Sequence, residues 1–242
     1  MLWHKQLPES WIYHTPGIWK IMTEQRFRAI KRYFREQSYS IAETQTDKLR
    51  WIRPLIDTMG KKFLREFTPG EWLTVDEAVI PFKGRWQGKQ YIKMKPVKWG
   101  IKIDMLCDQE TAYCVAFRVY QGKVTVPDEL KLLGTLGYIV AQLVLASEIE
   151  NSGRKLVTDR GYSSLPLSHY LAKKGLGHVG TIVTSRSGFP KSLKVKNTQR
   201  QGSWDWRRAR NILAVRWTDK KPIYFISNFH YPERDAVLRW SR

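Results

Sequence analysis

Three strand patterns in the middle of the chain restrict its fold more than any other feature of the sequence. Residues 71–79, 97–108 and 111–122 are rich in β-branched and aromatic side chains, and the second alternates apolar with polar positions. The turn Cys-Asp-Gln-Glu-Thr separates the last two of them. Because such short links join antiparallel neighbours, the sequence predicts a three-stranded meander.

Helix and strand patterns alternate after this meander. Residues 128–151 predict one long, mostly apolar helix, although Gly134 and Gly137 weaken its first turns. A buried strand that begins at 154 and ends in Asp159, a helix capped by Ser163 or Ser164 and ended by Gly175, and a strand over 177–183 follow. The order βββαβαβ predicts an α/β fold, a mixed sheet with helices on its faces.

The two ends of the chain differ from this middle part. Residues 1–70 are helical and basic in pattern, with Thr23 as the N-cap of one helix and Pro54 near the start of a second. From residue 184 the sequence is polar, basic and loop-like, and a hairpin over 212–230 with the turn Thr-Asp-Lys-Lys-Pro follows it. Since a lone hairpin is marginally stable, we expect partial disorder in residues 184–242.

The charge of the chain indicates its class of partner. Lys and Arg number 42 against 22 Asp and Glu, a formal net charge of +20, which favours nucleic acid, with an anionic membrane as the rival. We find no apolar run of about 18 residues and no signal peptide, so we expect an intracellular protein that does not span a membrane. Cys107 and Cys114 lack a zinc-site spacing and are expected to pack as small apolar side chains.

Two aspartates each follow an apolar strand pattern, Asp76 after Trp-Leu-Thr-Val and Asp159 after Lys-Leu-Val-Thr. If the two strands are neighbours, the carboxylates meet at one sheet edge, where a divalent cation would relieve their repulsion. Oxygen ligands without histidine point to Mg²⁺ or Mn²⁺ and to phosphoryl transfer. Each aspartate could instead cap a turn or a helix. Asp104 and Asp108 also flank strands and stay open as candidates, while Glu77 faces the other side of its strand.

Basic and aromatic residues supply candidate DNA contacts. Six follow Asp76 closely and could contact phosphates, or be solvated surface residues: Lys83, Arg85, Lys89, Lys93, Lys95 and Lys98. Arg160 could contact DNA or pair with a carboxylate. Trp204 and Trp206 could stack on an unpaired base or belong to a core, and the arginines around them are Arg200, Arg207, Arg208 and Arg210. We expect the stripe Trp99, Ile101, Ile103 and Met105 to be sheet core.

Three ordered segments resemble the piggyBac-type transposase family. Residues 68–113 resemble its first catalytic block, with the acidic pair Asp76-Glu77, the motif Phe-Lys-Gly-Arg and the run Tyr-x-x-x-Lys-Pro-x-Lys-x-Gly-Ile-Lys. Residues 156–182, beginning Leu-Val-Thr-Asp-Arg, resemble the second block. Residues 200–230 resemble the segment that follows, in which a Trp-x-Asp-Lys-Lys hairpin ends in histidine.

The resemblance implies an RNase H-like catalytic fold and Mg²⁺-dependent DNA transposition in the nucleus, with TTAA-type targets. It implies that Asp76 and Asp159 are catalytic, metal-binding aspartates. It also implies a helical region for dimerisation and DNA binding over residues 1–70, an incomplete RNase H-like core over 71–188, and the start of a β-rich insertion domain over 189–242. The expected partners are double-stranded DNA and a second copy of the chain.

The sequence departs from the family pattern in three places. It contains neither the family's third acidic motif nor its cysteine-rich zinc module, and Asp235 lies too early to replace the missing acid. Gly161 stands where the family has an aromatic residue. We therefore expect a C-terminally truncated chain that lacks the final catalytic helix, binds metal weakly and is a weak or inactive nuclease. The alternatives are a domesticated or decayed, non-catalytic DNA-binding protein and an incomplete gene model.

Overall fold

The computed structural model describes residues 21–33, 47–93, 95–96, 98–194 and 200–232, and it separates into two compact units, Met1–Thr58 and Met59–Arg242. The first unit contains α2 (Glu24–Tyr33). The Thr23 hydroxyl accepts the backbone N–H of Arg26 at 3.2 Å, so the predicted N-cap is confirmed. Phe34, which the apolar pattern of this helix also includes, lies outside the described residues.

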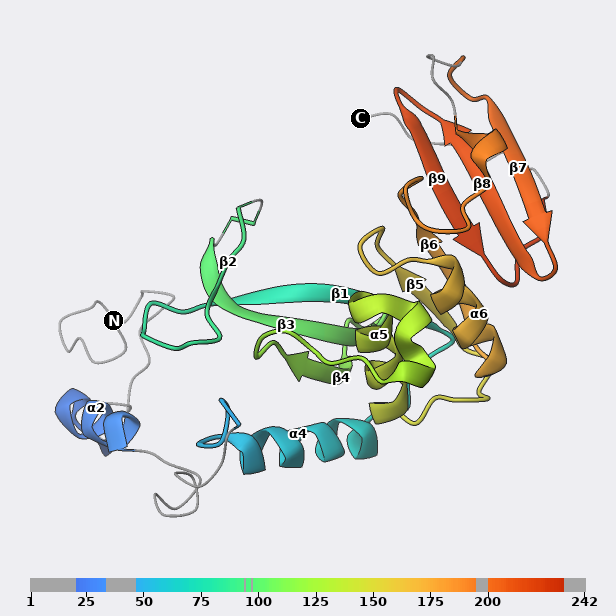
Figure 1. Ribbon diagram of the computed structural model, residues 1–242. Helices are drawn as coiled ribbons and strands as arrows, with labels where there is room; N and C mark the ends of the chain where they lie inside the picture. Colours follow the sequence, from blue (N-terminus) through green and yellow to red (C-terminus); the bar gives the residue numbers. More distant parts are fainter. Residues whose placement is uncertain (1–20, 34–46, 94, 97, 195–199, 233–242) are drawn as a thin grey trace, which may run out of the picture. The chain divides into compact units, whose positions relative to one another are not determined.

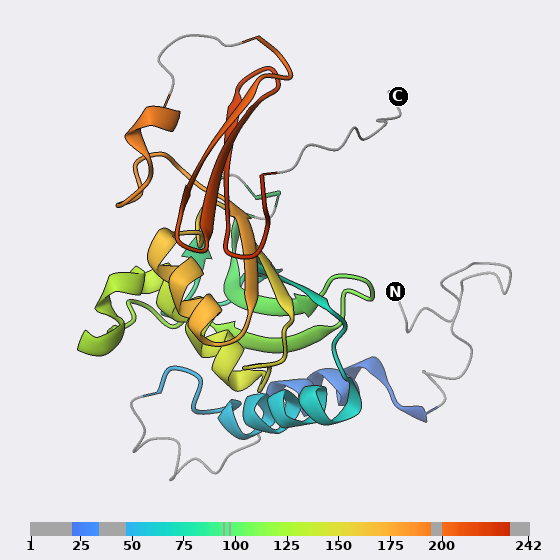
Figure 2. The same ribbon diagram turned by 90° about the vertical axis from the view of Figure 1, so that its right-hand side faces the viewer.

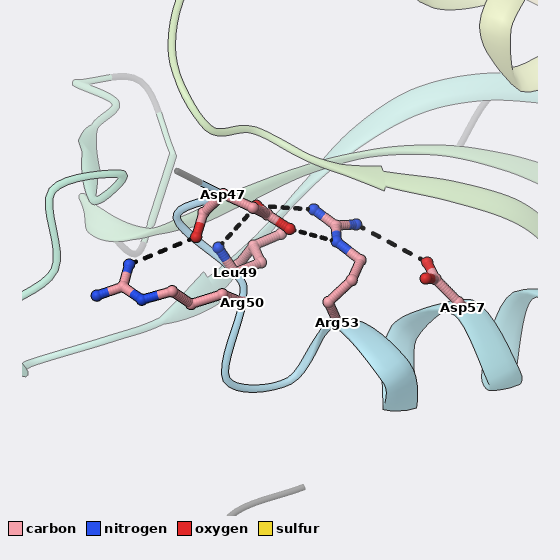
Figure 3. Close-up of polar contacts among 5 residues, drawn as sticks. All are labelled: Asp47, Leu49, Arg50, Arg53 and Asp57. Carbon is pink, nitrogen blue, oxygen red and sulfur yellow. Dashed lines mark hydrogen bonds and ion pairs between the residues drawn. The ribbon is translucent and has the colours of Figure 1, made fainter. Parts of the chain in front are cut away.

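A cluster of charged side chains lies at the start of α4 (Arg53–Glu66), as Figure 3 shows. The Asp47 carboxylate accepts Arg53 Nε at 2.6 Å and the Leu49 backbone N–H at 2.9 Å. The bond from Arg53 is the largest cause that holds the pKa of Asp47 below its usual range. Pro54 occupies the second helical position, where its missing N–H costs nothing, and the helix starts there as predicted.

The second unit is built on one nine-stranded sheet with the order β2-β3-β1-β5-β6-β9-β8-β7 and with β4 paired to β3 (Figure 1). The last three strands along the chain are β7 (Trp204–Ala209), β8 (Ile212–Thr218) and β9 (Pro222–Ser227). The predicted meander is confirmed in β1 (Trp72–Pro81), β3 (Trp99–Asp108) and β4 (Cys114–Val119), which pair antiparallel. β5 (Lys155–Thr158) and β6 (Gly177–Thr181) continue the sheet in parallel with β1. The short β2 (Gln90–Tyr91) was not predicted, because two residues make no pattern.

One face of this sheet carries the main core. Leu73, Val75 and Leu106 are fully buried there and pack with α5 (Gly134–Ala146) and α6 (Leu165–Lys173), the helices beside the sheet in Figure 1. The expectation that Trp99, Ile101, Ile103 and Met105 form core is wrong. Register places them on the opposite face, with Met105 paired to Asp76; Trp99 is exposed and the other three are only partly buried.

Both predicted helices form, and the first of them is divided in two. Residues 128–151 give a 3₁₀ helix, η1 (Asp128–Leu133), and then α5, because Gly134 has φ +64° between them. Ser164 Oγ caps α6 by accepting the Leu167 N–H at 3.2 Å. Gly175, with φ +65°, follows the end of that helix.

The segment Asp128–Ala146 corrects one sequence-based expectation. It is long and apolar enough to cross a membrane by length and composition, although we expected no such run. Core helices of globular domains meet the same criteria, and Ile139, Val140 and Leu143 of α5 are buried in the main core. Its packing is therefore that of a core helix.

The region after residue 200 extends the same sheet. The predicted hairpin is confirmed as β8 (Ile212–Thr218) and β9 (Pro222–Ser227), while β7 (Trp204–Ala209) was expected to be loop. β9 pairs antiparallel with β6, so this hairpin is not a lone one (Figure 2). A second cluster, including Phe189, Leu193 and Ile226, packs beside it. The reason for expecting disorder therefore does not apply to residues 200–232.

Candidate active site

Two neighbouring strands bring Asp76 and Asp159 to adjacent positions. β1 and β5 are parallel and paired up to Val75 and Thr158, and each aspartate is the next residue of its chain. β5 ends there, whereas β1 continues along β3 with Asp76 opposite Met105. Both aspartates are exposed. The structure therefore has the strand arrangement on which the sequence-based metal hypothesis depends.

Each aspartate is oriented through one carboxylate oxygen. Asp76 Oδ1 accepts the backbone N–H of Glu77 at 2.7 Å, and Asp159 Oδ1 accepts the backbone N–H of Arg160 at 2.6 Å. Asp159 Oδ1 also accepts the Thr181 hydroxyl at 3.2 Å. Within the described residues, the second oxygen of each carboxylate takes no hydrogen bond, which leaves it available to a cation.

Asp76 and Asp159 are the right type of ligand for a divalent metal ion, but there are too few of them for a tight site. Carboxylate oxygens are the ligands that Mg²⁺ and Mn²⁺ prefer. In the part of the chain that the structure describes, no group of three or more His, Cys, Asp and Glu side chains is placed to hold a metal ion. Asp235, the acid already set aside for its position in the sequence, lies outside that part. Two carboxylates alone would give a weak site.

A cavity of about 260 Å³ lies on the side of the sheet to which Glu77 points, opposite to the side chain of Asp76. Glu77, Asp159, Gly161 and Tyr162 contribute to its lining, so the cavity reaches one of the two aspartates. Glu77 lies on this face opposite Asp104, as its strand position predicts, and its carboxylate pairs with Lys95 Nζ at 3.4 Å. A Cβ at Gly161 would meet no atom within 4 Å, so the backbone has room for a side chain there.

Asp104 has a role that the sequence did not reveal. Its side chain is fully buried and accepts the Tyr162 hydroxyl at 2.7 Å, while Lys102 Nζ lies 3.2 Å away and Arg118 Nη1 3.7 Å away. Burial, followed by the charge of Asp104, raises the pKa of Tyr162. Since Tyr162 lies three residues after Asp159, this bond ties the Asp159 loop to β3. The only signal was an acid inside an apolar strand pattern.

Asp108, the other open candidate, organises a turn. Its carboxylate is buried and accepts the backbone N–H of Gly70 at 2.8 Å and both the N–H and the hydroxyl of Thr111. The bond from the Thr111 backbone is the largest cause that lowers the pKa of Asp108. With its oxygens occupied in this way, Asp108 is a structural residue of the β3–β4 turn.

The basic run after Asp76 is largely free at the surface. Lys83, Arg85, Lys93 and Lys98 are exposed. Lys89 and Lys95 are half-buried, and each donates to a backbone carbonyl, Lys89 to Gly84 at 3.1 Å and Lys95 to Glu77 at 3.2 Å. The structure thus places all six around β2 and the adjoining end of β3.

The second basic group lies on another part of the sheet. Arg200, Arg207 and Arg208 are exposed, and β7, which carries the last two, is separated from β1 by β5, β6, β9 and β8. Arg207 pairs with Asp205 at 2.7 Å. Trp204 is half-buried. Arg160, next to Asp159, is exposed. Of the candidate DNA contacts, Arg160 therefore lies beside the aspartates, and the β7 group does not.

Comparisons with known proteins agree on one family. The family model described as Transposase IS4 matches residues 1–239. The human piggyBac transposable element-derived protein 2 is 29% identical over 195 residues, 76% of this chain and 31% of that protein. The human piggyBac transposable element-derived protein 3 is 26% identical over 189 residues, 75% of this chain and 31% of that protein. The chain thus spans about a third of the length of these relatives.

A solved structure extends the likeness to the fold. The cryo-EM structure of the piggyBac transposase synaptic complex with hairpin DNA matches with a TM-score of 0.81 and 27% sequence identity, over 93% of this chain and 47% of that one. This match confirms the predicted α/β, RNase H-like fold class and the predicted resemblance to piggyBac. With a family match that covers nearly every residue, this chain belongs to the Transposase IS4 family, and it is similar to piggyBac transposase and to human piggyBac transposable element-derived proteins.

Proposed function

We propose that this chain binds double-stranded DNA across the Asp76–Asp159 edge of its sheet and that the two aspartates hold a divalent metal ion for DNA strand cleavage. The observation that carries the proposal is the parallel pairing of β1 and β5, which puts the two carboxylates at adjacent strand positions. The solved piggyBac transposase was determined with hairpin DNA, which supports DNA as the partner.

The roles of the residues follow from their environment. The backbone N–H groups of Glu77 and Arg160, together with the Thr181 hydroxyl, fix the orientation of the two carboxylates. A bound Mg²⁺ or Mn²⁺ would supply charge stabilisation and an activated water at this point. The exposed Lys83, Arg85, Lys93 and Lys98 would contact phosphates, so we expect binding to weaken steeply as salt rises.

A second candidate function is DNA binding without catalysis. It is favoured by the two-carboxylate site, because the described residues include no group of three His, Cys, Asp or Glu side chains placed to hold a metal ion. Nuclear localisation, TTAA-type targets, pairing of two copies and the roles given to residues 1–70, 71–188 and 189–242 belong to the proposal in either case, since they come from the family resemblance alone.

Nicking of supercoiled plasmid tests the proposal. The wild-type chain, Asp76→Asn and Asp159→Asn are compared with Mg²⁺, Mn²⁺ or EDTA, and DNA binding is measured in parallel. Asp128→Asn is the matched control, because that carboxylate is 93% exposed and lies on η1. We expect slow, metal-dependent nicking in the wild type and the control, and its loss in the two site variants.

Two other outcomes have definite meanings. Nicking at wild-type rates in Asp76→Asn or Asp159→Asn contradicts the catalytic assignment. No nicking by any of the proteins, with salt-sensitive DNA binding in all of them, favours the non-catalytic DNA-binding function.

A further inference from the structure

Two aromatic side chains stand exposed together at the β2 end of the sheet. Tyr91 of β2 lies directly opposite Trp99 of β3, and their ring centroids are 5.0 Å apart with the planes at 54°. Tyr91 is 51% exposed and Trp99 is 54% exposed. Ile80, which pairs with Ile101 on the same face of the sheet, is 50% exposed. Large apolar side chains grouped at a surface mark a place where something binds.

The charge around this pair selects the class of ligand. Between Glu77 and Asp104 the sequence has seven Lys or Arg residues and no acidic residue. One of them, Lys89, holds its ammonium group 5.3 Å from the centre of the Trp99 ring. Lys93 and Lys98, close in the sequence to the two aromatics, are exposed. Aromatic faces bordered by cations are the combination that binds single-stranded nucleic acid, with bases stacked on the rings and phosphates beside the lysines.

The pair also lies on the same side of the sheet as the candidate active site. In the register of β1 and β3, Asp76 is opposite Met105 and Ile80 is opposite Ile101. Trp99 lies two positions before Ile101 on β3, so the side chains of Asp76, Ile80 and Trp99 lie on one face of the sheet. Six strand positions separate the level of Asp76 from that of Trp99, about 20 Å at the rise of an extended strand. A DNA strand of a few nucleotides spans such a distance.

We propose that Trp99 and Tyr91 form a stacking platform for an unpaired base of a DNA strand that leads away from the Asp76–Asp159 edge. The inference rests on the proposed DNA-binding function and adds a ligand class to it, unpaired rather than duplex DNA. Lys89 holds its charge over the Trp99 ring, and Lys93 and Lys98 contact the phosphates on either side of the stacked base.

Fluorescence anisotropy with two DNA probes tests this platform. The probes are a short blunt duplex and the same duplex with a single-stranded tail. We expect Trp99→Ala to weaken binding of the tailed probe about tenfold and to leave binding of the blunt probe within about twofold. Trp99→Phe, which keeps an aromatic face, retains most of the affinity. Leu145→Ala is the control, because Leu145 is a large apolar side chain that is 66% exposed and lies on α5, away from every candidate DNA contact.

The outcomes separate this inference from the proposed function. If the wild type binds neither probe, both fail. If the wild type binds both probes and Trp99→Ala weakens both equally, or weakens neither, the platform alone is overturned. A change in the oligomeric state of Trp99→Ala, with unchanged binding of both probes, assigns the aromatic pair to contacts between copies and also overturns the platform. Thermal unfolding of every variant confirms that the comparison is between folded proteins.

Discussion

At the scale of single residues, the link between Tyr162 and Asp104 holds the loop of Asp159. The two residues are 58 positions apart, and their bond joins the segment after β5 to the middle of β3. The Asp104 carboxylate has no solvent exposure, so water cannot replace a lost donor. The buried Asp104 carboxylate therefore stabilises the folded protein only while its hydrogen-bond and ion-pair partners are present.

Tyr162→Phe tests this link. Removal of the hydroxyl leaves a buried carboxylate oxygen without its closest donor, and we expect the free energy of unfolding to fall by about 1–3 kcal/mol. Urea denaturation measures the change. Tyr91→Phe, at a half-exposed tyrosine, is the control and should cost less than about 0.5 kcal/mol. Equal effects of the two substitutions would show that the bond to Asp104 contributes nothing.

At the scale of elements, the β3–β4 pair places the chain's two thiols opposite each other. Cys107 and Cys114 are partners in the antiparallel register, next to an irregularity at Leu106 and Cys107, and both are free and half-buried. A hydrogen bond from Cys114 lowers the pKa of Cys107 to about 7, against the opposing effects of burial and of the Asp76 charge. The same pair raises the pKa of Cys114. The sequence, in which the two cysteines look like ordinary apolar residues, gave no sign of this coupling.

The contact between Cys107 and Cys114 predicts how fast the Cys107 thiol is alkylated at each pH. Alkylation of Cys107 by iodoacetamide, followed by mass spectrometry, should reach half its maximal rate near pH 7, because the thiolate is the reactive form. In Cys114→Ala the midpoint should move up toward the ordinary thiol range, since the stabilising donor is gone. An unchanged midpoint would rule out the hydrogen bond as the cause. In Cys107→Ser the pKa of Cys114 should fall and its alkylation should speed up, because the interaction with Cys107 is the largest cause that raises this pKa.

The elements also show what sequence patterns can and cannot predict. Alternation located β1, β3 and β4, and the cap at Ser164 and the glycine at 175 bounded α6, because these signals are local. The sequence could not predict that Trp99 lies on the face away from the core. Alternation only divides the side chains between two faces, and the strand register decides which face packs against the helices. β7 was missed because its polar, arginine-rich sequence resembles a loop. The adjacency of Asp76 and Asp159 needed the β1–β5 pairing, and the Asp104–Tyr162 bond needed the whole fold.

At the scale of the whole molecule, one buried histidine makes stability depend on pH. His178 of β6 has no solvent exposure and lies between the Thr158 and Ser168 hydroxyls, at 2.9 Å and 3.1 Å. Burial lowers its pKa to about 4. Between about pH 6.5 and pH 4 the unfolded chain binds a proton that the folded chain excludes, so acid favours unfolding in this window.

The expected loss can be measured directly. The free energy of unfolding should fall by about 3 kcal/mol from pH 7 to pH 4 through this group alone. Urea denaturation across that range compares the wild type with His178→Gln, in which the slope should be smaller. His169→Gln, at a half-exposed histidine of α6, is the control and should keep the wild-type slope. The same slope in all three proteins would assign the pH dependence to other groups.

The pairing of β6 with β9 has a further consequence, for aggregation. β6 hydrogen-bonds to β5 on one side and to β9 on the other, so its two edges are both satisfied only when the strands after residue 200 are present. A protein cut near residue 188 would keep the Asp76–Asp159 site but would expose a row of unpaired β6 amides and carbonyls. Such an open edge templates pairing with another chain. The β7–β9 strands therefore cover the β6 side of the sheet, which would otherwise be open to pairing with another chain.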